Sequence, residues 1–153
     1  MEMDTTRLGD VTVTGSRELI FEHGIPGFED LRRFDLLDLE IDLPIKLLQS
    51  ADNRDISLLV GNPFHFYPHY EWELAESVQQ ELGITDAAEL EIWSVIILPA
   101  NASAATINLQ APIVVNQKTG AAKQIILHNS IYSHRHPLLE EKSVEKTSQG
   151  QVE

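Results

Sequence analysis

Cysteine is absent from this sequence of 153 residues, and basic residues are scarce, with 11 lysines and arginines against 24 aspartates and glutamates. The lack of cysteine excludes disulfide bonds and thiolate metal ligands. A formal net charge of -13 repels phosphate backbones, so we expect no direct binding to nucleic acid. No apolar run approaches the roughly 20 residues of a membrane-spanning helix, and the polar, acidic start is unlike a signal peptide. We therefore expect a cytoplasmic protein that does not bind membranes.

The acidic residues are unevenly distributed along the chain. They concentrate between Glu18 and Asp42 and again between Glu71 and Glu91. Such a surface steers a basic protein partner toward it. It also serves simply to keep a small domain in solution. The composition leaves both interpretations open.

Strand patterns dominate the chain. Residues 10–22 alternate apolar and polar side chains on both sides of Gly15 and Ser16, which predicts a β-hairpin with its turn at this pair. Further strands are predicted between turn residues at 34–39, 45–49, 56–60, 91–98, 105–109, 113–115 and 123–127. About eight short strands at this spacing predict an all-β, mainly antiparallel fold, a small closed or nearly closed β-barrel.

One segment has the period of a helix. Trp72, Ala75, Val78 and Leu82 fall on one helical face, and Gly83 is a typical residue to end the helix. We therefore expect one short helix over 72–82 that packs on the barrel. The last residues, 140–153, are charged and contain no aromatic residue, which predicts a disordered tail after a single domain over 1–139.

The stretch GIPGFED, residues 24–30, is rich in glycine but does not resemble a phosphate-binding loop. Pro26 lacks an N–H group, and the stretch contains no basic residue. Pro26 and Gly27 instead suit the central positions of a type II turn, in which Gly27 has a positive φ. Phe28 is then expected to pack the turn against the barrel. Gly24 tolerates alanine if its φ is negative.

The histidines offer a possible metal site. His65, His69 and Glu71 lie close together in sequence, which invites comparison with metal-binding jelly rolls. In those proteins two histidines one residue apart point inward from one strand, whereas Pro68 separates His65 from His69. We therefore expect no metal and no cofactor, and we keep a small-molecule or metal-binding barrel enzyme as the alternative function.

Half of the ten aromatic residues lie in the nine positions 64–72, which follow Pro63 and contain Pro68: Phe64, Phe66, Tyr67, Tyr70 and Trp72. Some of them must belong to the core. Rigid aromatic side chains in a loop restrained by proline also suit a protein interface, because little side-chain entropy is lost on binding. Asn108 presents a similar choice, since asparagine in a strand either caps neighbouring backbone groups or contacts a partner.

Five stretches occur in the order IFEHGIPGFE (20–29), LLQS (47–50), NPFHFYPHYEWEL (62–74), INLQAPIVVN (107–116) and KQIILHNSIYSHRHPLL (123–139). Together they resemble the FliW family of flagellar assembly factors. The resemblance implies a small, cytoplasmic, non-enzymatic barrel that binds unpolymerised flagellin. It also implies that the RNA-binding regulator CsrA binds in competition with flagellin, so that FliW relieves the repression of flagellin synthesis. We expect the protein to act as a monomer.

The residues expected to contact these partners come from three parts of the chain. They are the aromatic residues of the 62–74 stretch, the acids of the 24–30 stretch and one asparagine, that is Phe64, Phe66, Tyr67, Tyr70, Glu29, Asp30 and Asn108. The acids are expected to face a basic surface of CsrA, and the aromatic residues to face flagellin. No catalytic residue is expected.

Overall fold

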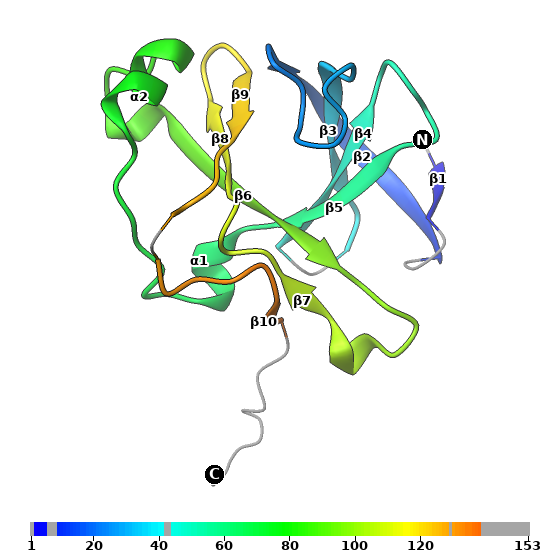
Figure 1. Ribbon diagram of the computed structural model, residues 1–153. Coiled ribbons are helices and arrows are strands. Elements are labelled where there is room, and N and C mark those ends of the chain that lie inside the picture. Colours follow the sequence, from blue (N-terminus) through cyan, green and yellow to red (C-terminus); the bar gives the residue numbers. More distant parts are fainter. Residues whose placement is uncertain (1, 6–8, 42–43, 129, 139–153) are drawn as a thin grey trace, which may run out of the picture.

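The computed structural model describes residues 2–5, 9–41, 44–128 and 130–138, and its centre is a closed β-barrel (Figure 1). Seven of the described strands form it: β2 (Gly9–Phe21), β3 (Arg33–Leu39), β4 (Ile45–Ser50), β5 (Ser57–Gly61), β6 (Leu90–Ile97), β8 (Ile113–Asn116) and β9 (Ala121–Gln124). Strand β6 pairs with both β5 and β8, which closes the ring. This confirms the predicted all-β barrel.

Neighbouring barrel strands are antiparallel, except that β2 and β9 are parallel. Three short strands extend the sheet. β1 (Glu2–Thr5) pairs with the start of β2, β7 (Thr106–Ile107) with the end of β6, and β10 (His136–Pro137) with β7. Most of the predicted strands therefore exist, with ends that differ by a few residues.

The barrel interior is filled by apolar side chains from all seven strands. Large residues of this cluster that are at most 2% exposed include Leu19, Phe21, Phe34, Leu36, Leu48, Val60, Ile113 and Val115. Phe21 and Phe34 meet edge to face, with ring centroids 5.3 Å apart. Full burial of each large apolar side chain contributes roughly 1.5–3 kcal/mol, so this cluster is the main stabilising element of the fold.

The predicted hairpin over residues 10–22 is wrong, because residues 10–21 lie within one 13-residue strand, β2. The pairing with β3 is irregular between Val13, opposite Leu39, and Gly15, opposite Asp38. Glycine and serine are typical of a β-bulge as well as of a turn. Pairing along the whole of β3 buries the apolar face of β2, which a hairpin at this point would interrupt.

Two predicted strands, 105–109 and 123–127, are shorter in the structure, as β7 and β9. The side chain of Asn108 explains the first difference, because its Oδ1 accepts hydrogen bonds from the backbone N–H groups of Gln110 and Ala111, each at 3.0 Å. These amides are then turned away from the sheet. The neighbouring segment after β9 therefore donates hydrogen bonds to the carbonyls of Pro112 and Gln110 but receives none from the Gln110 and Ala111 amides.

Two α-helices are described, and only one was predicted. α2 (Glu76–Leu82) begins four residues later than expected and ends at Gly83, whose φ of 70° confirms the predicted stop. α1 (Pro63–Phe66) occupies a stretch predicted as a loop, where Asn62 accepts a hydrogen bond from the N–H of Phe64 at 2.9 Å. Asparagine before proline is a standard helix start.

The helices lie at different places on the barrel. Figure 1 shows α2 beside the β8–β9 hairpin and α1 near β10, and short 3₁₀ turns, η1 (Ala87–Glu89) and η2 (Ala102–Ala104), flank β6. Neither α-helix in the described part of the chain is long and apolar enough to cross a bilayer. The tail predicted as disordered, 140–153, lies outside the described residues.

Candidate functional site

The 24–30 loop is a tight turn, as predicted. The N–H of Phe28 donates to the carbonyl of Ile25 at 2.6 Å, and Gly27 has a φ of 90°. A positive φ at the third position is what a type II turn requires, and proline suits the second position. The loop therefore has a conformational role, and its glycines bend the chain after β2.

Two details of this loop differ from expectation. Phe28 is 40% exposed, whereas Ile25 is 3% exposed and belongs to the barrel core, so Ile25 and not Phe28 packs the turn against the barrel. Gly24 has a φ of 71°, and a Cβ built on it would lie 2.5 Å from the carbonyl oxygen of Glu29. The condition under which Gly24 was expected to tolerate alanine, a negative φ, is therefore not met, and the close approach of Glu29 leaves room only for glycine.

The same loop presents Glu29 and Asp30 to solvent. Both residues are exposed, and Glu29 Oε2 accepts a hydrogen bond from the Gly27 N–H at 3.2 Å. Neither acid forms an ion pair with a described residue. Among the described residues, the lysines and arginines that do form ion pairs each face an acid of the chain itself: Arg17, Arg33, Lys46, Lys118 and Lys123. Glu29 and Asp30 therefore form an acidic corner of the surface whose charge no described lysine or arginine neutralises.

The aromatic stretch divides into exposed and buried members. Phe64 on α1 is 42% exposed, Phe66 and Tyr67 are half-buried, and Tyr70 is 3% exposed. The Phe64 ring lies against Tyr70, with centroids 5.6 Å apart. The Tyr67 hydroxyl donates to the carbonyl of Pro137. Phe64 is therefore the aromatic residue most available to a partner.

Tyr70 is a core residue that supports this surface from beneath. Its hydroxyl donates to the carbonyl of Leu109 at 2.7 Å, and its ring packs edge to face against Tyr132 at 4.7 Å between centroids. Burial raises the pKa of the Tyr70 phenol, so the hydroxyl keeps its proton and its donor role. The buried Tyr70 ring therefore supports the exposed Phe64 ring, and a role of Tyr70 in partner binding remains a prediction.

Asn108 is half-buried, and its side-chain oxygen caps the Gln110 and Ala111 amides. This is the capping role that the sequence left as one alternative. Its other suggested role, contact with a partner, remains a prediction.

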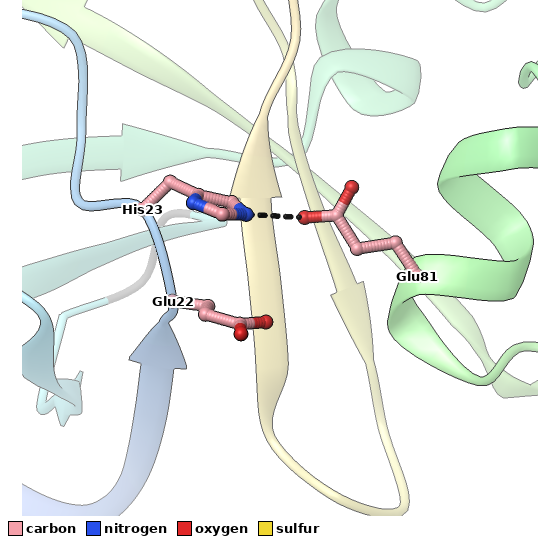
Figure 2. Close-up of side chains that lie close together, drawn as sticks. All are labelled: Glu22, His23 and Glu81. Carbon is pink, nitrogen blue, oxygen red and sulfur yellow. Dashed lines mark ion pairs between the residues drawn. The ribbon is translucent and has the colours of Figure 1, made fainter.

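The histidines considered from the sequence do not form a cluster with acids in the described structure. His65, His69 and Glu71 are all exposed. Among the described residues, one group brings three metal-ligating atoms within 4.8 Å of one another, namely Glu22, His23 and Glu81 (Figure 2). Sequence reasoning missed this group, because 58 positions separate His23 from Glu81 and no spacing motif connects them.

The Figure 2 group joins the end of β2 to α2 by an ion pair. His23 Nε2 lies 3.2 Å from Glu81 Oε2, and the other oxygen of Glu81 accepts a hydrogen bond from Lys123 Nζ at 2.9 Å. One nitrogen and two carboxylates suit a divalent transition metal. The Lys123 ammonium opposes a second cation there, so we assign the group a structural role in holding α2 against the barrel.

Glu89, at the end of η1 between α2 and β6, makes the stability of the fold depend on pH. Hydrogen bonds from the Thr85 N–H and from Lys118 lower the pKa of Glu89 below 4.5. Because the folded-state pKa is the lower one, the stabilisation is complete above pH 4.5 and is lost as the pH falls through the folded-state pKa. We expect Glu89→Gln to show a smaller loss of stability than the unmodified protein between about pH 5 and pH 3 in urea unfolding.

The matched control is Lys118→Met, which removes only the second of the two causes and should retain part of the acid sensitivity. Equal acid dependence in Glu89→Gln and the unmodified protein would contradict the assignment.

Comparison with known proteins agrees with this architecture. The family model described as FliW protein matches residues 2–138. The flagellar assembly factor FliW of Thermoanaerobacter pseudethanolicus is 40% identical over 142 residues, which cover 92% of this chain and 95% of that protein. FliW of Bacillus subtilis strain 168 is 35% identical over 138 residues, which cover 90% and 96% of the two chains. A crystal structure of a flagellar assembly factor FliW superposes with a TM-score of 0.79 at 33% identity and covers 93% of this chain and 99% of that one. The chain belongs to the FliW family of flagellar assembly factors.

Proposed function

We propose that this protein binds unpolymerised flagellin and, in competition with flagellin, the translational regulator CsrA. Family membership over residues 2–138 is the observation that carries the proposal. When flagellin accumulates it occupies the protein, and free CsrA represses flagellin synthesis. When flagellin is secreted the protein binds CsrA instead and relieves that repression. The protein thus couples synthesis of flagellin to its export, without catalysis and from the cytoplasm.

The acidic surface supports the CsrA part of the proposal. An RNA-binding surface is basic, and the exposed Glu29 and Asp30 lie on a corner without an ion-pairing base in the described structure. An acidic protein docked beside that surface adds like-charge repulsion to any approaching phosphate within a Debye length of about 10 Å at 0.1 M salt. Inhibition then does not require that the RNA site itself be covered.

We expect the association rate with CsrA to fall as salt rises from low to physiological concentration, with a smaller change in the dissociation rate. Surface plasmon resonance across a salt series measures both rates. The charge-reversed double variant Glu29→Lys and Asp30→Lys should associate more slowly and lose part of the salt dependence, while its melting temperature stays nearly unchanged because both side chains are exposed. An association rate that does not respond to salt would remove the electrostatic component.

The exposed ring of Phe64 supports the flagellin part. We expect Phe64→Ala to weaken flagellin binding by about 2 kcal/mol, the size typical of an aromatic interface residue, with little change in unfolding free energy. Phe66→Ala and Tyr67→Ala, both at half-buried positions, should lose some stability as well as affinity. Calorimetry of binding and urea unfolding separate the two effects. Unchanged affinity in folded Phe64→Ala would exclude α1 from the interface.

One experiment distinguishes this proposal from a barrel enzyme that binds a metal or small molecule. Thermal unfolding is measured with flagellin, with CsrA and with divalent cations in turn. Ligands that bind only the folded state raise the melting temperature. Stabilisation by each protein supports the proposal, and stabilisation by a cation but by neither protein would replace it with the alternative.

A further inference from the structure

A groove of about 360 Å³ runs between the segment before α2 and the segment after β9. It is lined by residues from both segments and from α2: Trp72, Glu73, Ala75, Val78, Ile125, Ile126, Leu127, His128 and Ser130. Neither the acidic corner nor Phe64 contributes to it. One of its walls contains residues 125–127, which follow β9 directly and form hydrogen bonds at alternate residues, as a strand does.

One edge of this wall is paired, and the other has no hydrogen-bond partner among the residues that the structure describes. Ile125 N–H donates to the carbonyl of Pro112 at 3.0 Å, and Leu127 N–H to that of Gln110 at 2.7 Å. In extended chain, the N–H and C=O groups of the intervening residue point to the opposite edge. Ile126 is that residue. Its side chain is 50% exposed, and its N–H donates to no residue that the structure describes.

The floor of the groove is apolar. Trp72, Val78 and Ile125 are half-buried against the cluster formed by Leu82, Ile84 and Val114. A free strand edge next to apolar side chains is the arrangement to which an added strand binds, because main-chain hydrogen bonds supply affinity and alternate side chains enter the groove.

Acidic residues lie along the segment that lines one side of the groove: Glu73 is a lining residue, and Glu71 and Glu76 are next to lining residues in the sequence. Glu71, Glu73 and Glu76 are exposed, and none of them forms an ion pair with a described residue. The nearby base Lys123 is paired with Glu81. Charge complementarity therefore favours a partner segment that carries lysine or arginine.

We propose that the free edge at Ile126 accepts an extended segment of a protein partner, with alternating apolar and basic residues, as an added strand. The apolar side chains of that segment occupy the groove beside Trp72 and Val78. Its basic side chains face Glu73 and Glu76. This surface is separate from Phe64 and from the acidic corner, so the proposal does not depend on which residues bind flagellin or CsrA.

The probe is a fluorescein-labelled decapeptide in which valine and lysine alternate, and the reference peptide alternates valine and glutamate. By fluorescence polarisation we expect the valine–lysine peptide to bind with a Kd of about 100 μM and the reference at least tenfold more weakly. Hydrogen exchange at the Ile126 amide should slow at least fivefold in the saturated complex. No binding of the valine–lysine peptide, equal binding of both peptides, or binding without protection of this amide would overturn the proposal.

Substitution of the edge residue tests the main-chain bond directly. Ile126→Pro removes the N–H donor and should weaken the valine–lysine peptide at least tenfold, whereas Ile126→Val keeps the donor and should bind within twofold of the unmodified protein. Ile131→Pro, at an 87% exposed position outside the groove, is the control for a surface proline. If Ile126→Pro does not fold, Glu73→Lys with Glu76→Lys decides the question. Loss of at least fivefold in peptide affinity supports the proposal, and unchanged affinity contradicts it.

Discussion

Replacing Gly24 with alanine should lower the free energy of unfolding by roughly 2–4 kcal/mol, because two penalties act at one residue. A φ of 71° in a residue with a side chain costs about 1 kcal/mol. The added Cβ would also lie 2.5 Å from the carbonyl oxygen of Glu29 and 2.6 Å from its Cα, and backbone atoms cannot move aside as a flexible side chain does. Such overpacking adds roughly 1–3 kcal/mol. Urea unfolding followed by tryptophan fluorescence measures the difference.

Gly24→Ala should also slow the proposed binding to CsrA. Relief of the overlap moves Glu29 and the adjacent Asp30, so the association rate with CsrA should fall in whatever fraction of the variant remains folded. The control is Gly27→Ala, whose φ is 90° but whose added Cβ meets no atom within 4 Å. We expect that variant to lose only about 1 kcal/mol. Equal losses in the two variants would show that the close approach of residues 24 and 29 is not part of the folded state in solution.

A second large effect is expected at Asn116, which is 2% exposed and connects α2 to the β8–β9 turn. Its Nδ2 donates to the carbonyls of Leu82 at 2.8 Å and Gly83 at 3.4 Å, and its Oδ1 accepts from the N–H groups of Lys118 at 2.9 Å and Thr119 at 3.4 Å. Asn116→Ala removes the side-chain partner of the buried carbonyl of Leu82 and of the partly buried N–H groups of Lys118 and Thr119. Each such group costs about 1–3 kcal/mol, so we expect a loss of about 3 kcal/mol in urea unfolding.

The matched control for this site is Asn116→Asp. It keeps the acceptor for the turn amides but directs a carboxylate oxygen toward the carbonyl of Leu82. The loss should persist at neutral pH and become smaller in acid, where a protonated carboxyl group can donate a hydrogen bond. A loss below about 1 kcal/mol for Asn116→Ala would mean that α2 is held mainly by the apolar contacts of Leu82 and Ile84 with Val114.

The local pattern of the chain was sufficient to predict the barrel. β3, β4 and β6 are short apolar-rich segments between turn residues, and this spacing is visible without a structure. The sequence did not show that β3 and β4 are buried on both faces, with Leu36 and Leu48 in the barrel core and Leu37 and Leu47 in a second cluster. The positive φ at Gly27 and the helix stop at Gly83 were predictable, since each depends on a few neighbouring residues. Asn62–Pro63 was an available helix signal that the prediction overlooked.

The candidate surfaces were less predictable, because burial depends on what lies opposite. Phe28 and Ile25 flank the same turn and are both apolar, yet only Ile25 faces the barrel interior. Phe64 and Tyr70 belong to one aromatic stretch, but α1 turns Phe64 outward while the carbonyl of Leu109 receives the Tyr70 hydroxyl. Contacts between residues tens of positions apart determine which of these side chains are buried, and a local sequence pattern carries no information about such contacts.

The sequence by itself determined the fold class, the acidic charge and the positions of the main turns, because those properties are local or additive along the chain. Only the tertiary structure decided that β2 continues through Gly15, that Gly24 lies against Glu29, and that the Ile126 N–H meets no acceptor among the described residues. The physical reason is the same in each case. A hydrogen bond, a steric overlap or an unpaired strand edge is a relation between two segments, and it exists only when the barrel has closed and placed them side by side.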